Sequence, residues 1–285
     1  MILTSHAFAK LNLSLDIVSR MDNGYHYLKM VMQTINLCDE ITIECKHGGN
    51  GFSVIAGLPF LPHDERNITV KAAKAFFKHT EISGFHTKIR VKKNIPVCAG
   101  MGGGSADAAA VLRMLNEMFE TNLDSETLRT LGLSVGSDVP FCIDGGTALA
   151  EGQGEILTNL PPLPTAHFVV CKPHFSCSTP QLFSLVRCEK IRARPDTAGL
   201  VTALKSGDLG GIARRMYNVF EDILPRGKAE VDEIKGILLD LGALGAVMTG
   251  SGPTVFGVFD NENKARSAYE RLKPEYDDCF LTNNA

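Results

Sequence analysis

The stretch PVCAGMGGGSADAAA, residues 96–110, joins a glycine-rich loop to an alanine-rich segment that predicts a helix. Four of the five residues from Gly100 to Gly104 are glycine, which loses more backbone freedom on folding than any other residue. The N-terminus of a helix carries unpaired N–H groups and a partial positive charge, and glycines before it let an anion approach. Ser105 is the expected cap of this helix, and Asp107 is expected in its first turn. The stretch therefore predicts a phosphate-binding loop; the alternative is a tight turn without a ligand.

The known phosphate-loop patterns narrow this prediction. A Walker A loop needs a lysine after its last glycine, but Ser105 follows Gly104. The dinucleotide pattern GxGxxG fails because Ser105 stands where its third glycine would be, and the serine-hydrolase pattern GxSxG fails at Asp107. A cation that neutralises the phosphates must then come from elsewhere in the chain. Lys93 is the candidate; the alternative is that Lys93 is a solvated strand end. A second glycine turn, TGSGPTVFGVF at 249–259, predicts a hairpin turn or a second part of the same site.

Composition excludes several classes of protein. The 285 residues carry a net charge of −3, which argues against a nucleic-acid or anionic-membrane partner. No apolar run approaches the roughly 18 residues of a membrane span, and the N-terminus lacks the basic and apolar blocks of a secretory signal. The eight cysteines are scattered without metal-ligand spacing. We expect a cytoplasmic protein with reduced thiols, no membrane partner and no nucleic-acid partner.

The order of the predicted elements indicates an α+β fold in two lobes. Strand patterns come early, at 2–9, 11–18, 30–37 and 41–45, whereas helical patterns follow in blocks. The proline-rich segment TNLPPLPTAHF, 158–168, predicts a boundary between lobes 1–158 and 159–285. The predicted helices begin at Asn67, a plausible N-cap, and after Gly104 and Asp124, and cover 179–186, 196–204, 208–217 and 228–241.

Four stretches together carry a resemblance to a known family. They are residues 96–110, AFAKLNLSLDI at 7–17, GSDVPF at 136–141 and MTGSGPTVF at 248–256. With them the chain resembles, over nearly its whole length, the small-molecule kinases that include galactokinase, homoserine kinase, mevalonate kinase and phosphomevalonate kinase. The resemblance implies a two-lobed small-molecule kinase fold with the active site in the cleft between lobes. It also implies ATP as cofactor together with Mg²⁺.

Two shorter stretches, KLNL at 10–13 and NGYHYL at 23–28, resemble one branch of that family. For this branch the implied small-molecule substrate is a CDP-methylerythritol, phosphorylated on its 2-hydroxyl in the non-mevalonate route to isoprenoids. The ligands of Mg²⁺ and the existence of a homodimer stay open.

The resemblance assigns residues to three tasks. The implied catalytic residues are Asp138 as base and Lys10 as its partner. The implied nucleotide-binding residues are Asn67, Lys93, Pro96, Gly100, Met101, Gly102, Gly103, Gly104, Ser105 and Ala106. The implied substrate-binding residues are Asn12, Tyr25, His26, Thr179, Phe183, Gly250 and Ser251.

The chemistry of these residue types agrees with the tasks, although each has a simpler alternative. A carboxylate such as Asp138 can take a hydroxyl proton, but an aspartate before a helix is often a cap or turn residue. Lys10 interrupts a strand of alternating apolar residues, where an edge lysine is the usual case. Tyr25 can stack on cytosine and His26 can pair with its edge, but Asn23-Gly24 also predicts a simple hairpin turn.

Three further residues complete the substrate candidates. Asn12 shares a strand face with Lys10 and is therefore a candidate hydrogen-bond partner of the substrate. Phe183, with Thr179 four residues upstream, is a candidate for the second face of a cytosine sandwich; ordinary helix packing gives the same spacing.

Overall fold

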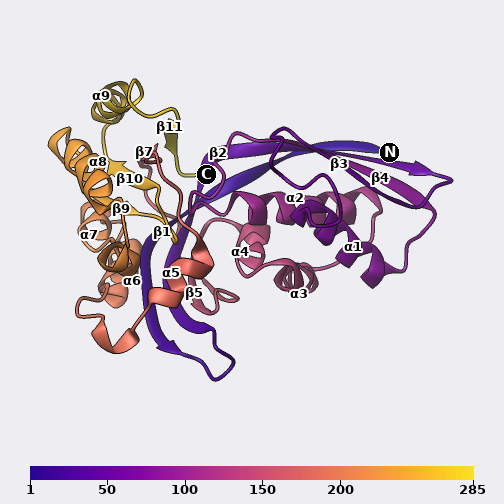
Figure 1. Ribbon diagram of the computed structural model, residues 1–285, viewed down its shortest axis with the longest axis horizontal. Helices are drawn as coiled ribbons and strands as arrows, with labels where there is room; N and C mark the ends of the chain where they lie inside the picture. The colour runs from indigo at the N-terminus through magenta and orange to yellow at the C-terminus, as the bar shows by residue number, and fades with distance from the viewer. The chain divides into compact units, whose positions relative to one another are not determined.

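The computed structural model describes residues 1–285, and its helices and strands confirm the α+β class (Figure 1). The strands are β1 (Ile2–Arg20), β2 (His26–His47), β3 (Gly51–Ala56), β4 (Phe85–Lys92), β5 (Thr147–Gly152), β6 (Ile156–Asn159), β7 (His167–Cys171), β8 (Tyr217–Asn218), β9 (Gly245–Met248), β10 (Val255–Phe259) and β11 (Cys279–Asn283). The helices are α1 (Ile68–Thr80), α2 (Gly103–Met118), α3 (Ser125–Val135), α4 (Val139–Asp144), α5 (Thr179–Leu185), α6 (Thr197–Ser206), α7 (Leu209–Ala213), α8 (Lys228–Asp240) and α9 (Glu262–Leu272), with short 3-10 helices η1 (Cys188–Lys190) and η2 (Val219–Ile223).

The strands form two sheets. In the larger sheet the order is β3–β4–β2–β1–β8, and β5 pairs with both β2 and β6. The smaller sheet is antiparallel, in the order β11–β7–β10–β9. The two early strands expected at 2–9 and 11–18 are one continuous strand, β1, because the chain stays extended through the buried Lys10. The segments 30–37 and 41–45 likewise belong to one strand, β2.

Packing divides the chain into two compact units that are interleaved in sequence. Unit 1 comprises Met1–Ala9, Leu37–Val97 and Gly102–Gly145, and unit 2 comprises Lys10–Asn36, Cys98–Met101 and Gly146–Ala285. This division differs from the consecutive lobes 1–158 and 159–285, because the long strands β1 and β2 contribute residues to both units. The proline-rich segment lies inside unit 2, where it connects β6 to β7.

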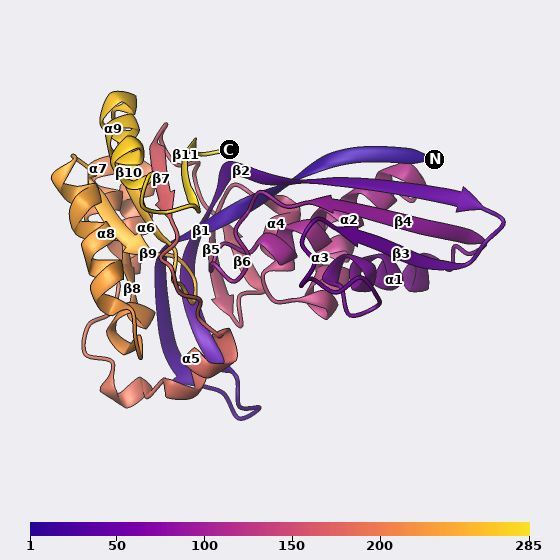
Figure 2. The same cartoon turned by 45° about the horizontal axis from the view of Figure 1, so that its top comes forward.

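Unit 1 is a sheet with helices packed on one of its faces. In Figures 1 and 2, helices α1 to α4 lie on the same side of β2, β3 and β4. Its core joins the inward residues of the strands, such as Ile41, Ile43 and Ile89, to the apolar face of α1 around Phe76 and to the alanines of α2. Small side chains on α2 let this helix pack closely, so the sequence run that follows the glycines is wholly buried from Ala106 to Leu112.

Unit 2 builds its second core on the smaller sheet. Helices α8 and α9 pack on one side of β7, β9 and β10 (Figure 2), and their apolar residues meet Val169, Val255 and Phe259 from the strands. The helix expected at 208–217 is shorter than the sequence pattern predicts. Here α7 ends at Ala213, and the chain becomes extended again so that β8 pairs with Ser14 and Leu15 of β1. None of the helices has the length and apolarity needed to cross a bilayer.

Candidate active site

The glycine-rich loop begins helix α2 as predicted, but its cap is a glycine. Gly102 is the N-cap with φ of 67°, in the left-handed region that favours glycine, and no side chain caps the helix. The predicted cap is therefore wrong: Ser105 is the third helical residue, and Asp107 lies beyond the first turn. Without a side-chain cap, the first N–H groups of α2 keep their capacity to bind an anion.

The starts of α1 and α2 and the segment before α4 meet inside unit 1. A Cβ on Gly104 would lie 3.6 Å from the Cγ2 of Ile68, the first residue of α1. A Cβ on Gly136 would lie 3.9 Å from both the Ile68 Cδ1 and the Ser105 Oγ. Fold packing thus brings the GSDVPF segment to the beginning of α2, where the positive ends of helix dipoles favour a negatively charged ligand.

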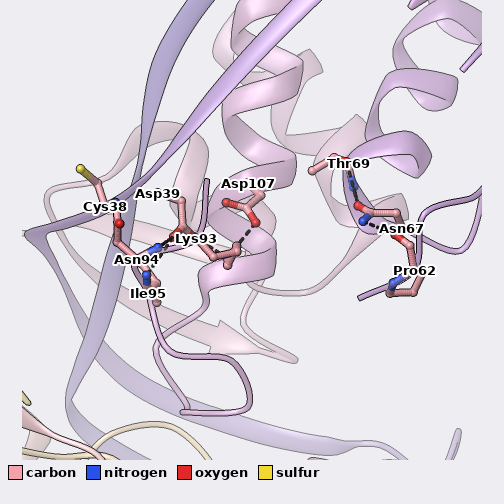
Figure 3. A network of polar contacts seen from close by, with 9 residues as sticks. All are labelled: Cys38, Asp39, Pro62, Asn67, Thr69, Lys93, Asn94, Ile95 and Asp107. Atoms are coloured by element: carbon pink, nitrogen blue, oxygen red, sulfur yellow. Dashed lines mark hydrogen bonds and ion pairs between the residues drawn. The ribbon is translucent and has the colours of Figure 1, made fainter. Parts of the chain in front are cut away.

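Lys93 reaches the start of α2 through a buried ion network (Figure 3). Its ammonium donates to the Asp107 Oδ2 at 2.9 Å and to the Asp39 Oδ2, and its side chain is only 6% exposed. The interpretation of Lys93 as a solvated strand end is therefore wrong. A Cβ on Gly103 would lie 3.3 Å from the Lys93 Nζ, so the ammonium lies directly against the first turn of α2.

The surroundings of this network favour the charged form of Lys93 and disfavour the charged form of Asp107. Burial lowers the pKa of Lys93, but the charges of Asp107 and Asp39 outweigh burial and raise it above its ordinary value. Burial raises the pKa of Asp107 to about 8 against the opposing effect of Lys93, and the Asp39 charge adds to the rise. Lys93 therefore stays protonated, and Asp107 is the member whose ionisation is disfavoured. Its Oδ1 is buried without a hydrogen-bond partner.

Asn67 acts as the predicted cap of α1. Its Oδ1 accepts from the backbone N–H of Thr69 at 3.0 Å and from the Thr69 hydroxyl at 2.7 Å, while its Nδ2 donates to the Pro62 carbonyl at 2.7 Å. These bonds, drawn in Figure 3, explain the residue without a ligand. The expected contact of Asn67 with a nucleotide is not needed for its side-chain amide to be satisfied.

Asp138 stands at the N-cap position of α4 and makes no side-chain hydrogen bond to that helix. Its backbone carbonyl begins the helix by accepting from the N–H of Cys142 at 3.2 Å, and its side chain is partly exposed. The simple alternative, a capping aspartate, is thus not what this carboxylate does.

In unit 2 the two glycine turns meet backbone to backbone. Gly100 has φ of 75°, and a Cβ there would lie 2.2 Å from the Thr249 carbonyl oxygen. Gly250 has φ of 56°, and its Cβ would lie 2.5 Å from the Gly100 carbonyl oxygen. These two glycines are required by this close approach, and the second turn is part of the same local structure as the first.

Lys10 lies beside these turns in the buried part of β1. Its backbone N–H donates to the Met101 carbonyl at 3.0 Å, and its ammonium donates to the Asn12 Oδ1 at 2.7 Å. Lys10 is only 4% exposed and Asn12 is fully buried. The amide of Asn12, which we expected to bind substrate, has partners within the protein: its Oδ1 accepts from Lys10 and its Nδ2 donates to the Met30 sulfur.

Two residues of this region escaped the sequence analysis. The Thr249 hydroxyl accepts from the backbone N–H of Asn12 at 2.9 Å, which ties the second glycine turn to β1. The Nδ2 of Asn218 donates to the carbonyls of Met248 and Gly250, both at 2.8 Å. Asn218 is fully buried, and a polar residue in the apolar run YNVF was the available signal.

The hairpin between β1 and β2 carries the predicted aromatic pair. Asn23 and Gly24 form the turn: the backbone N–H of Tyr25 donates to the Asn23 Oδ1 at 3.0 Å, and Gly24 has φ of 86°. The Tyr25 residue is 61% exposed. His26 stacks on Phe183 of α5 with ring centroids 5.3 Å apart and an interplanar angle of 28°.

His26 is kept neutral. Burial lowers its pKa and the Arg20 charge lowers it further, so one ring nitrogen donates and the other accepts. Beside it, the Thr179 hydroxyl hydrogen-bonds the Ser251 hydroxyl at 2.7 Å. Within unit 2, α5 therefore contacts both the β1–β2 hairpin and the second glycine turn.

Chelating side chains do not gather anywhere in the chain: no three His, Cys, Asp or Glu residues are placed to hold a metal ion. Pro96 is partly buried before the loop, Met101 is buried within it, and Ala106 is buried in the first turn of α2.

Family models match both parts of the chain. Residues 67–146 match the GHMP kinases N terminal domain, and residues 200–278 match the GHMP kinases C terminal domain. The first match contains the glycine-rich loop, Lys93 and Asp138, and the second contains Asn218 and the second glycine turn.

Two relatives that match over nearly their whole length carry the same name. The chain is 41% identical over 278 residues to the 4-diphosphocytidyl-2-C-methyl-D-erythritol kinase of Clostridium botulinum (strain Langeland), covering 98% of each chain. It is 44% identical over 276 residues to the enzyme of that name from Acetivibrio thermocellus, covering 97% of this chain and 96% of that one.

Solved structures extend the likeness to the fold. A crystal structure of 4-(cytidine 5'-diphospho)-2C-methyl-D-erythritol kinase matches with a TM-score of 0.84 at 30% identity, covering 99% of both chains. L. major mevalonate kinase in complex with R-mevalonate matches with a TM-score of 0.76, covering 99% of this chain and 95% of that one. At 19% identity, the second likeness shows the fold alone.

Proposed function

The chain belongs to the 4-diphosphocytidyl-2-C-methyl-D-erythritol kinase family of GHMP kinases, and we propose that it phosphorylates the 2-hydroxyl of 4-diphosphocytidyl-2-C-methyl-D-erythritol. It is an ATP-dependent small-molecule kinase. The observation that carries the choice of acceptor is the stacked pair of a neutral His26 and Phe183. A flat ring with adjacent donor and acceptor groups, such as cytosine, suits an aromatic face beside a neutral imidazole.

We propose that the ATP phosphates bind at the start of α2. Three features support this site: a glycine cap with no side chain in the way, the uncapped N–H groups of the first turn, and the Lys93 ammonium against Gly103. The protein offers no cluster of carboxylates for a dedicated Mg²⁺ site. A magnesium ion bound to ATP would neutralise phosphate charge and would be held largely by phosphate oxygens and water.

For the chemical step, we propose Asp138 as the base and Lys10 as the cation that faces the acceptor oxygen. The Asp138 carboxylate takes the proton of the 2-hydroxyl, and the oxygen forms a bond to the γ-phosphorus of ATP. The bond from this phosphorus to the bridging oxygen breaks, and ADP leaves with the electron pair. Support comes from a carboxylate that does not cap its own helix, and from an ammonium that Asn12 holds in a buried strand.

The acceptor is proposed to bind along unit 2. Tyr25 supplies an exposed ring for stacking on the cytosine. Phe183 supplies a second ring, which makes a T-shaped contact with Phe220 at a centroid distance of 5.0 Å. Thr179 and Ser251 add paired hydroxyls, and Gly250, with φ of 56°, is part of the turn that carries Ser251. In this proposal Asn12 acts through Lys10 rather than on the substrate.

A coupled ADP-release assay tests the proposal. The enzyme with ATP and Mg²⁺ is given 4-diphosphocytidyl-2-C-methyl-D-erythritol, mevalonate or homoserine at equal concentrations. We expect turnover with the cytidine-bearing alcohol and a kcat/KM at least about 100-fold lower with the other two, since both lack the base that the rings would hold. Equal or faster turnover of mevalonate or homoserine would refute the assigned acceptor while leaving the kinase chemistry in place.

A further inference from the structure

A buried carboxylate in unit 1 is unused by the proposed mechanism. Asp39 of β2 is fully buried, and it accepts three hydrogen bonds from the consecutive residues 93–95. Its Oδ1 accepts from the backbone N–H groups of Asn94 at 2.6 Å and Ile95 at 2.8 Å, and its Oδ2 accepts from the Lys93 ammonium. A buried carboxylate is costly unless it is hydrogen-bonded and paired, and this one is both.

Segment 93–95 packs against the first turn of α2. A Cβ on Gly103 would lie 3.0 Å from the Ile95 Cγ2 and 3.3 Å from the Lys93 Nζ. Both neighbours of Gly103 therefore belong to the segment that Asp39 holds. Any movement of this segment would change the surface on which the proposed phosphate site rests.

Asp39 and Asp107 differ in how many of their carboxylate oxygens are hydrogen-bonded. Asp39 has both oxygens engaged, whereas Asp107 has one oxygen bonded to Lys93 and the other without a partner. The lysine ammonium has three N–H groups, and the carboxylates take two of them.

We propose that Asp39 is a positioning residue for ATP binding, which holds the Lys93 ammonium and the Ile95 side chain against the first turn of α2. This inference rests on the proposed nucleotide site and deepens it. Asp39 does not touch the nucleotide; it acts through Lys93. A purely structural Asp39 would stabilise the fold without a selective effect on ATP.

The substitution Asp39→Asn separates the two roles of the carboxylate. An asparagine keeps the size of the side chain, and its Oδ1 can still accept from the N–H groups of Asn94 and Ile95. Its Nδ2 cannot accept from the Lys93 ammonium and instead turns N–H groups toward it. If the ammonium that Asp39 no longer holds fails to donate to the phosphates, the loss of that charge-assisted hydrogen bond corresponds to about 10- to 100-fold in binding. We expect the KM for ATP to rise by about that factor, with the KM for the alcohol changed by less than about 2-fold.

The matched control is Glu44→Gln on the same strand. The Glu44 carboxylate pairs with Lys46 at 3.1 Å, away from segment 93–95, and its replacement should leave both KM values unchanged. A lowered melting temperature of Asp39→Asn with a normal KM for ATP would overturn the proposal in favour of a structural role.

A second comparison keeps the test decisive if Asp39→Asn does not fold. In Asp39→Asn/Lys93→Met both members of the Asp39–Lys93 ion pair are replaced by uncharged side chains, so neither is left as an unpaired charge. If Asp39 acts through Lys93, this double variant has the same raised KM for ATP as Lys93→Met. A higher value in the double variant would contradict action through Lys93. A normal KM for ATP in Lys93→Met would refute the nucleotide site itself, whereas an impaired Lys93→Met with a normal Asp39→Asn would refute only this inference.

Discussion

Replacing Gly100 by alanine tests whether the two glycine turns of unit 2 require backbone contact. The new Cβ would lie 2.2 Å from the Thr249 carbonyl oxygen and 3.0 Å from the Gly252 nitrogen, so the turns must separate by about 1 Å to restore ordinary contact. The left-handed conformation of Gly100 adds about 1–2 kcal/mol for any L-residue. Backbone displacement in a packed region costs about 1–3 kcal/mol more.

The expected loss of stability is therefore about 2–5 kcal/mol, the sum of these two terms. In a thermal melt followed by circular dichroism this corresponds to a decrease of about 5 to 15 °C. The matched control is Gly104→Ala, whose Cβ would lie 3.6 Å from the Ile68 Cγ2, an ordinary contact. Alanine at this helical position should leave the melting temperature unchanged or slightly higher.

Two results would refute this reasoning. A melting temperature of Gly100→Ala within about 2 °C of the wild type would show that the turns need no such contact. An equal decrease in Gly104→Ala would show that the loop is sensitive to any side chain, rather than to the close approach at Gly100.

Three further predictions concern the proposed catalytic base Asp138, the binding of the acceptor by Tyr25, and the raised pKa of Asp107. Asp138→Asn should lower kcat by at least ~10²-fold while calorimetry still detects ATP binding, and near-normal turnover would remove Asp138 from the mechanism. Tyr25→Ala should raise the KM for the cytidine-bearing alcohol by about 5- to 150-fold without changing that for ATP, because base stacking is worth about 1–3 kcal/mol. Tyr25→Phe should change little, and an unchanged KM in Tyr25→Ala would contradict stacking. Asp107 has its pKa raised to about 8 in the folded protein, so between pH 4 and 8 the unfolded chain loses a proton that the folded protein keeps, and stability falls as pH rises. Urea unfolding should therefore show the stability of Asp107→Asn, relative to wild type, increasing from pH 5 to 8, and a constant difference would contradict the raised pKa.

Local signals in the sequence determined much of the secondary structure and the location of the candidate loops. The Asn67 cap, the Asn23-Gly24 turn and the start of α2 within the glycine run depend on residues within a few positions of one another. Side-chain capping, positive φ angles and helical periodicity act over that range, so a single sequence suffices to predict them. The choice of Ser105 as cap failed because Gly102 adopts the left-handed conformation one turn earlier.

The partners of the polar candidates were decided only by tertiary structure. Lys93 pairs with Asp39, 54 residues earlier in the chain, and the backbone N–H of Asn12 donates to the Thr249 hydroxyl across 237 residues. Asn12 was expected to bind substrate, but full burial beside Lys10 gives its amide another partner. The extent of β1 and β2 and the interleaving of the two units also depend on pairing between distant segments.

The physical reason is that local elements and buried charges are stabilised by different parts of the chain. A cap or a turn is stabilised by bonds within its own segment, so residue types and spacing specify it. A buried charge such as Asp39 or Lys93 is tolerated only if the fold supplies donors and an opposite charge, and these come from elements that the sequence does not place side by side. The sequence therefore determined which segments could bind a phosphate, and packing decided which side chains stand beside them.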